Sequence, residues 1–200
     1  MSNIYKSLAL KTTKYYVKKS IISESKQDVY SYGFEILISN LVYTLIFIIT
    51  AIITDTLLES AFFWFGFYIL RTICGGYHAK SYLMCHILFF FNHVLFIFFL
   101  KFLSGEVLLL PQILITVSSF IVLIIGPVAH PNKPFIKGEK KRFRKISFCY
   151  AILLIVIFSI FVLFFNISTC DLVSSYAFGT FSATISLISA KILYKKGEGK

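Results

Sequence analysis

A histidine and a cysteine lie seven residues apart in this chain, within a basic segment that also contains two glycines. His78 and Cys85 belong to segment 71–85, which lies between two long apolar runs. A thiolate can attack a carbonyl carbon while an imidazole accepts the thiol proton and later returns it. The pair therefore predicts nucleophilic acyl chemistry at a membrane surface.

The backbone around this pair must turn sharply. On one straight helix, residues seven apart are separated by about 10 Å along the axis, whereas a base and its nucleophile need about 3 Å. We therefore expect residues 75–80 to fold back over the start of a helix that carries Cys85 in its first turn or two. Gly75 and Gly76 allow such a turn, and the positive charges of Arg71 and Lys80 favour a thiolate.

The composition indicates an all-α integral membrane protein. The chain has 200 residues, of which 58% are hydrophobic and 14% charged, whereas soluble domains have about 25% charged residues. A spanning helix needs about 20 mostly apolar residues. The sequence predicts six transmembrane helices, at 36–54, 57–73, 82–103, 107–128, 146–166 and 172–192.

The basic residues predict the orientation of these spans, because cytoplasmic loops collect Lys and Arg. With both termini cytoplasmic, every Lys and Arg except Lys101 falls on the inner side. The net charge of +11 then reflects topology and attraction to the anionic headgroups of membrane lipids, and no nucleic-acid partner is expected. The cytoplasm keeps thiols reduced, which suits a catalytic cysteine.

Three parts of the chain are predicted. Residues 1–34 form a basic cytoplasmic segment whose apolar side chains suit an interfacial amphipathic helix, although a basic tail that only sets topology is the alternative. Residues 35–192 form the six-helix transmembrane domain, with cytoplasmic loops at 71–81 and 129–145, and residues 193–200 form a cytoplasmic tail.

Simpler roles remain open for the titratable residues of the site. A metal site from Cys74, His78, Cys85 and His86 is disfavoured because no carboxylate lies nearby to orient a ligand, so no metal and no cofactor is expected. His86 is expected to be structural, and His93 and His130 are expected to pack or to lie at an interface. Cys149 and Cys170 fall in or beside apolar runs and are expected to be buried and inert.

Segment 71–85 resembles the signature of the accessory gene regulator protein B (AgrB) family, through Arg71, the Gly-Gly pair, His78-Ala79 and Cys85. Two further pieces resemble the family: Tyr-Gly-Phe-Glu at 32–35 before the first span, and the Asn-Lys-Pro of loop 127–134. The resemblance covers about residues 30–150, and the order and spacing of its pieces fit the predicted spans.

The resemblance implies a membrane cysteine endopeptidase of Gram-positive quorum sensing, located in the plasma membrane with its active site on the cytoplasmic side. His78 would be the general base and Cys85 the nucleophile. The enzyme would remove the C-terminal tail of a small AgrD-like propeptide through a thioester on Cys85, leading to a cyclic thiolactone or lactone. A homodimer is also implied by the resemblance.

Two supporting roles are predicted from charge. Glu35 would orient His78 as the third member of a triad does, pair with Arg71, or cap a helix at the interface. A basic cluster would contact lipid headgroups or, as a less favoured alternative, an acidic substrate tail; its members are Lys140, Lys141, Arg142, Arg144 and Lys145.

The main alternative from another class is a non-enzymatic membrane protein, such as a small transporter or a peptide-export accessory protein. A transporter should have charged or polar residues midway through its spans. The predicted spans contain no mid-membrane carboxylate, and their notable polar residues, Asn40, Asn92, His93 and Gln112, would also suit hydrogen bonds between helices.

Overall fold

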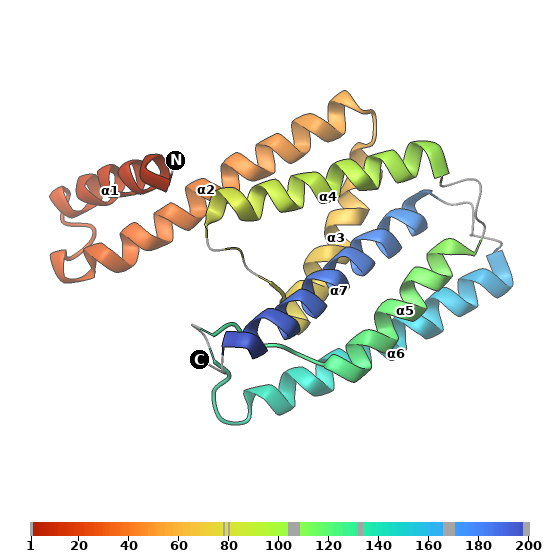
Figure 1. The fold of residues 1–200 in the computed structure, drawn as a ribbon. Helices are drawn as coiled ribbons and strands as arrows, with labels where there is room; N and C mark the ends of the chain where they lie inside the picture. The colour runs from red at the N-terminus through yellow and green to blue at the C-terminus, as the bar shows by residue number, and fades with distance from the viewer. Residues whose placement is uncertain are drawn as a thin grey trace. The chain divides into compact units, whose positions relative to one another are not determined.

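The computed structural model describes residues 2–77, 79, 81–103, 109–131, 134–165 and 171–197, and these form helices joined by short connections (Figure 1). No strand occurs in these described ranges, which confirms the predicted all-α class. The helices are α1 (Ser2–Lys18), the short 3₁₀ helix η1 (Glu24–Lys26), α2 (Gln27–Ile53), α3 (Leu57–Cys74), α4 (Tyr82–Leu103), α5 (Leu110–Ile125), α6 (Glu139–Phe165) and α7 (Asp171–Gly197).

Among the residues that the structure describes, five helices are long and apolar enough to cross a membrane: α2, α3, α4, α6 and α7. The predicted span 107–128 corresponds to α5, which has 16 residues and ends at Ile125, just before Gly126, where φ is +60°. An integral membrane protein is thus confirmed, while the six-span topology with both termini cytoplasmic stays a prediction.

Two helices begin earlier than the hydropathy predicted. α6 starts at Glu139, so the basic cluster expected in loop 129–145 lies in the first two turns of a helix. Likewise α2 starts at Gln27, before the predicted span. Lys, Arg and Glu are good helix formers, so a helix can continue beyond the apolar stretch that would lie in lipid.

The described residues divide into two compact units, which are described separately: residues 1–55 with 79–91, and residues 56–78 with 92–200. In the first unit α1 packs along α2. Ala9 and Thr13 are fully buried, and the rings of Tyr16 and Phe34 stack with centroids 5.7 Å apart. The helix predicted near the N-terminus therefore exists, and Ile4 and Leu8 on it stay exposed.

In the second unit α3 and α7 approach very closely (Figure 1). A Cβ atom added to Gly66 on α3 would lie 2.5 Å from the carbonyl oxygen of Tyr176, and one added to Gly179 on α7 would lie 2.0 Å from that of Phe63. Small residues let helix backbones approach in this way in membrane proteins.

The other side of α7 packs against α5. The core where α3, α5, α6 and α7 meet is formed by Leu70, Cys74, Val122, Ala151, Ala183 and Leu187. This core fixes the ends of α3, α5 and α7, from which the candidate site is built.

Candidate functional site

The backbone turns sharply where α3 ends, in the segment that leads to His78. Gly75 has φ +77° and ψ −161°, a conformation open essentially only to glycine. Its N–H donates to the carbonyl oxygen of Arg71 at 2.9 Å. The predicted need for glycine at this turn is therefore met at Gly75, while the predicted loop 71–81 begins later, because Arg71 lies in the last turn of α3.

Arg71 holds this segment against α7. Its Nη1 donates to the hydroxyl oxygen of Ser186 at 2.6 Å, and its Nη2 donates to the carbonyl oxygen of Tyr77 at 2.6 Å. The Tyr77 N–H in turn donates to the carbonyl oxygen of Ser186 at 3.0 Å and to its hydroxyl oxygen at 3.1 Å. Arg71, Tyr77 and Ser186 thus form a closed set of hydrogen bonds, which we call the Arg71 clamp.

Gly76 lies inside the clamp. It is buried, and a Cβ atom at this position would lie 2.7 Å from Nη1 of Arg71 and 2.8 Å from the hydroxyl oxygen of Ser186. The predicted role of Gly76 in close backbone approach therefore has a specific cause: a side chain would separate Arg71 from Ser186.

A second chain segment, which follows α5, lies against the first. The Val128 N–H donates to the carbonyl oxygen of Cys74 at 2.9 Å, and a Cβ atom on Gly75 would lie 2.3 Å from the carbonyl oxygen of Val128. The ring of His130 packs edge-on against Tyr194 with centroids 5.3 Å apart. Tyr194 also reaches the carbonyl oxygen of Gly76 at 3.5 Å, at the long end of hydrogen bonding.

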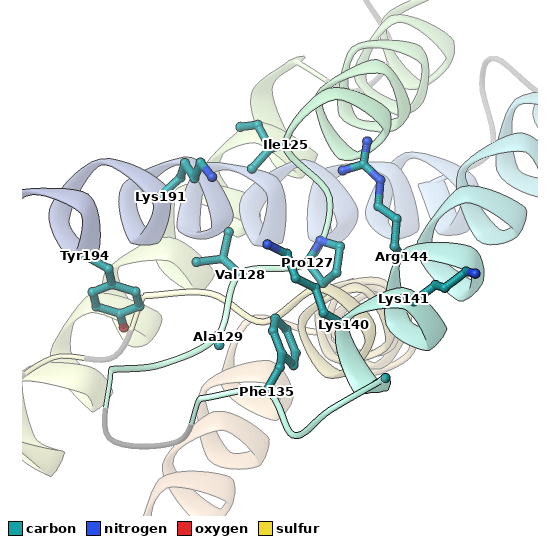
Figure 2. Close-up of a pocket in the computed structure, with 11 residues that line it drawn as sticks. Ile125, Pro127, Val128, Ala129, Phe135, Lys140, Lys141, Arg144, Lys191 and Tyr194 are labelled. Carbon is teal, nitrogen blue, oxygen red and sulfur yellow. The ribbon is translucent and has the colours of Figure 1, made fainter. Parts of the chain in front are cut away.

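These elements enclose a basic pocket of about 830 Å³ (Figure 2). Its wall combines the segment after α5, the start of α6 and the end of α7, and its cations are Lys140, Lys141, Arg144 and Lys191. Phe135 and Tyr194 add aromatic surface. We call this site the basic pocket. Its charges and its rings suit an anionic ligand with apolar parts.

The predicted basic cluster is divided between two surfaces. Lys140 lines the basic pocket, Lys141 and Arg144 line both the basic pocket and a second hollow of about 700 Å³ beside Phe148, and Arg142 and Lys145 line the second hollow. Arg144 has a further role, since its Nη2 donates to the carbonyl oxygen of Leu123 at 2.7 Å. That carbonyl belongs to the last turn of α5, where a cation is favourable.

Cys85 lies in the first turn of α4 and in the first unit, and it is partly exposed. The helix start is capped by Ser81, whose hydroxyl oxygen accepts from the Met84 N–H at 3.3 Å. The Cys85 N–H donates to the carbonyl oxygen of Ser81 at 3.1 Å. The predicted placement of Cys85 in the first turn or two of its helix is confirmed.

The neighbouring His86 has a packing environment. Its Nε2 lies 3.2 Å from the hydroxyl oxygen of Ser39, and its ring stacks on Tyr43 with centroids 5.2 Å apart. His93 is fully buried and lies 2.9 Å from the hydroxyl oxygen of Ser60. Both surroundings agree with the packing roles expected for these histidines.

The remaining cysteines differ in exposure. Cys74 is buried in the core and contacts the hydroxyl oxygen of Ser147 at 3.4 Å. Cys149 is exposed on α6, so its predicted burial is wrong. The reason is physical: an apolar side chain on a membrane helix can face lipid and does not need the protein interior. Cys170 lies outside the described residues.

Three other predicted site residues are placed only in part. Glu35 is half-buried in the interior of α2, eight residues after the helix starts, so a helix-cap role for it is wrong. His78 and Lys80 lie outside the described residues, and their roles stay predictions.

Sequence reasoning missed three residues of the site: Ser186, Lys191 and Tyr194, all on α7. In the sequence, Ser186 resembles a packing residue in a weakly apolar span, and Lys191 resembles a lysine that only sets the membrane topology. Nothing local marks these three residues, because the residues they contact are far away in the sequence.

The long apolar helices indicate a multi-pass membrane protein, and its second unit contains a glycine-rich turn and a basic pocket. The family model for accessory gene regulator B matches residues 9–189, and the chain belongs to this family. No curated protein and no solved structure matches the chain. The family is of protease type and processes quorum-sensing propeptides, which implies an AgrD propeptide as the partner.

Proposed function

We propose that the protein is a cysteine endopeptidase that removes the C-terminal tail of an AgrD-type propeptide at the cytoplasmic face of the plasma membrane. The observation that carries this proposal is the family match over residues 9–189, which includes both His78 and Cys85. The partly exposed Cys85 in the first turn of α4 supports it. So does the anchoring of the turn that precedes His78 by Arg71.

In the proposed reaction the Cys85 sulfur attacks the carbonyl carbon of the scissile peptide bond while His78 accepts the thiol proton. The C–N bond then breaks, and His78 returns the proton to the amine of the departing tail. The acyl group remains on Cys85 as a thioester. A thiol or hydroxyl of the retained peptide attacks this thioester, gives up its proton, and leaves Cys85 as the free thiol and the peptide as a ring.

The basic pocket is proposed to hold the carboxylates of the substrate tail. Cations spread over a flat surface would be enough to bind lipid headgroups. Lys140 and Lys191 instead come from different helices and line one cavity of about 830 Å³. The aromatic surface of Phe135 and Tyr194 can take apolar side chains of the same peptide. Headgroup contact then remains the proposed role of Arg142 and Lys145, which line the second hollow.

The deciding experiment is mass spectrometry of a candidate propeptide co-expressed with wild-type protein, Cys85→Ala, His78→Ala and Cys149→Ala. We expect tail removal with wild type and with Cys149→Ala, whose thiol is exposed on α6, but not with the other two variants. A trapped thioester with wild type would add direct support. Cleavage by Cys85→Ala would contradict the assignment of the nucleophile.

The pocket is tested by charge reversal. Lys191→Glu should weaken the binding of a synthetic tail peptide, whereas Lys145→Glu, outside the pocket, should leave it within about threefold. Each reversed charge at short range is expected to cost on the order of 1 kcal/mol, or several-fold in affinity. Equal effects of the two variants would assign the pocket to headgroups.

The polar groups of the predicted spans favour the endopeptidase over the alternative of a transporter or export accessory protein, because they bond to neighbouring helices. The amide of Asn92 accepts from the Ser182 hydroxyl at 3.0 Å, and Gln112 donates to the hydroxyl oxygen of Ser159 at 3.2 Å. These groups join helices to one another, as interhelical hydrogen bonds in membranes do.

A further inference from the structure

We infer that Ser186 of α7 is a positioning residue for the proposed reaction, acting through Tyr77 on the adjacent His78. The inference rests on the proposed function. The Ser186 hydroxyl oxygen accepts both from Arg71 and from the Tyr77 N–H, while its carbonyl oxygen accepts from the same N–H. One serine thus fixes the backbone immediately before His78.

The charge of Arg71 strengthens the hydrogen bonds of the clamp. A guanidinium presents several N–H donors in a rigid planar fork, and here two of them bind Ser186 and the carbonyl oxygen of Tyr77. Hydrogen bonds from a charged donor are stronger than neutral ones. Without the Ser186 hydroxyl, Arg71 loses one of these anchors and can move together with Tyr77.

The neighbouring glycines make the segment depend on the clamp. Gly75 is held at φ +77° and no side chain is present at Gly76, so neither residue restricts the backbone by its own conformational preferences. The path of the chain as far as Tyr77 is therefore set by its contacts with α7 and with Val128. A general base needs placement within hydrogen-bond reach of the proton it accepts.

Substitutions on α7 separate this role from simple packing. Ser186→Ala removes the hydroxyl from the clamp, and Ser186→Thr restores a hydroxyl at the same place. Ser189→Ala is the matched control, because in the described part of the chain the Ser189 hydroxyl donates to the carbonyl oxygen of Ile185 in its own helix. Comparable thermal stability of the three variants would show that they fold alike.

The measurement is the rate at which iodoacetamide alkylates Cys85 in the full-length protein in nanodiscs, as a function of pH, followed on the Cys85-containing peptide by mass spectrometry. His78→Ala should flatten the profile at neutral pH if His78 is the base. Ser186→Ala should move the profile toward that of His78→Ala and lower the rate of propeptide cleavage on the order of tenfold to a hundredfold. Its KM should change little, and Ser186→Thr and Ser189→Ala should match wild type.

The possible outcomes can be told apart. If His78→Ala differs from wild type while Ser186→Ala does not, the positioning role is wrong and the proposed function stands. If His78→Ala itself matches wild type, the proposed Cys–His pair is wrong and the inference falls with it. If Ser189→Ala lowers the rate as much as Ser186→Ala, the effect belongs to α7 packing and the inference is also wrong.

Discussion

Replacing Gly75 with alanine should damage the protein more than the same change at Gly138, and the structure gives the reason. Both glycines have positive φ, +77° and +87°. A non-glycine residue in such a conformation costs about 1–3 kcal/mol. Alanine also restricts the unfolded chain, which offsets this by about 0.4–1 kcal/mol. These two contributions to the free energy of unfolding are the same at Gly75 and at Gly138.

Their surroundings then differ. A Cβ atom on Gly138 meets nothing within 4 Å, whereas one on Gly75 would lie 2.3 Å from the carbonyl oxygen of Val128. Normal contact would require a shift of about 1 Å, and forced overpacking of this kind costs about 1–3 kcal/mol. Val128 cannot withdraw freely, because its N–H is bonded to the carbonyl oxygen of Cys74 at 2.9 Å. We expect Gly75→Ala to be less stable than Gly138→Ala by about 1–3 kcal/mol.

The assay combines stability with processing. Thermal unfolding of both variants in detergent gives the stability difference, and co-expression with a propeptide gives the extent of tail removal. Gly75→Ala should lower the processing rate at least about tenfold, since about 1.4 kcal/mol of distortion at the turn before His78 corresponds to that factor. Gly138→Ala should process within a few-fold of wild type. Equal losses at the two sites would refute the reasoning, because conformational strain alone would then explain both.

Four further substitutions test other parts of the chain. Gly179→Ala should lower the thermal unfolding midpoint, at a cost of about 1–3 kcal/mol, because its Cβ atom would lie 2.0 Å from a backbone carbonyl of α3. Gly33→Ala should raise the unfolding midpoint by the equivalent of about 0.5–1 kcal/mol, because a Cβ atom on Gly33 would have no atom within 4 Å. Glu35→Gln should slow propeptide cleavage if this carboxylate orients His78, and unchanged cleavage would exclude that role. Arg144→Met should destabilise the protein by about 1 kcal/mol in the same unfolding assay, since it removes the donor to the Leu123 carbonyl oxygen.

Hydropathy predicted where membrane helices occur, but not where helices begin. The apolar stretch of α6 was placed correctly, yet the helix starts at Glu139 and includes the basic cluster. Lipid requires a run of about 20 apolar residues, and this requirement says nothing about polar residues that extend the same helix into water. Charged side chains with high helix propensity do so at little cost.

The contacts of the site could not be predicted, because they join distant parts of the sequence. Arg71 and Ser186 are 115 residues apart and meet at 2.6 Å. A serine in an apolar run is equally consistent with helix packing, and nothing local distinguishes Ser186 from Ser189. Lys191 illustrates the same limit for charge, since a lysine that sets topology can also line a pocket.

The close packing of α3 on α7 and the Arg71 clamp depend on each other. Gly66 and Gly179 permit a backbone approach that a methyl group would prevent, and close-packed interfaces have few alternative arrangements. This approach fixes the position of Ser186 relative to Arg71. Ser186 is seven positions after Gly179, about 10 Å along the helix, so a displacement of α7 at Gly179 should also move the Arg71 clamp. The small residues of the least apolar predicted span would then serve two purposes, since they bring the helices together and determine where the turn before His78 is held.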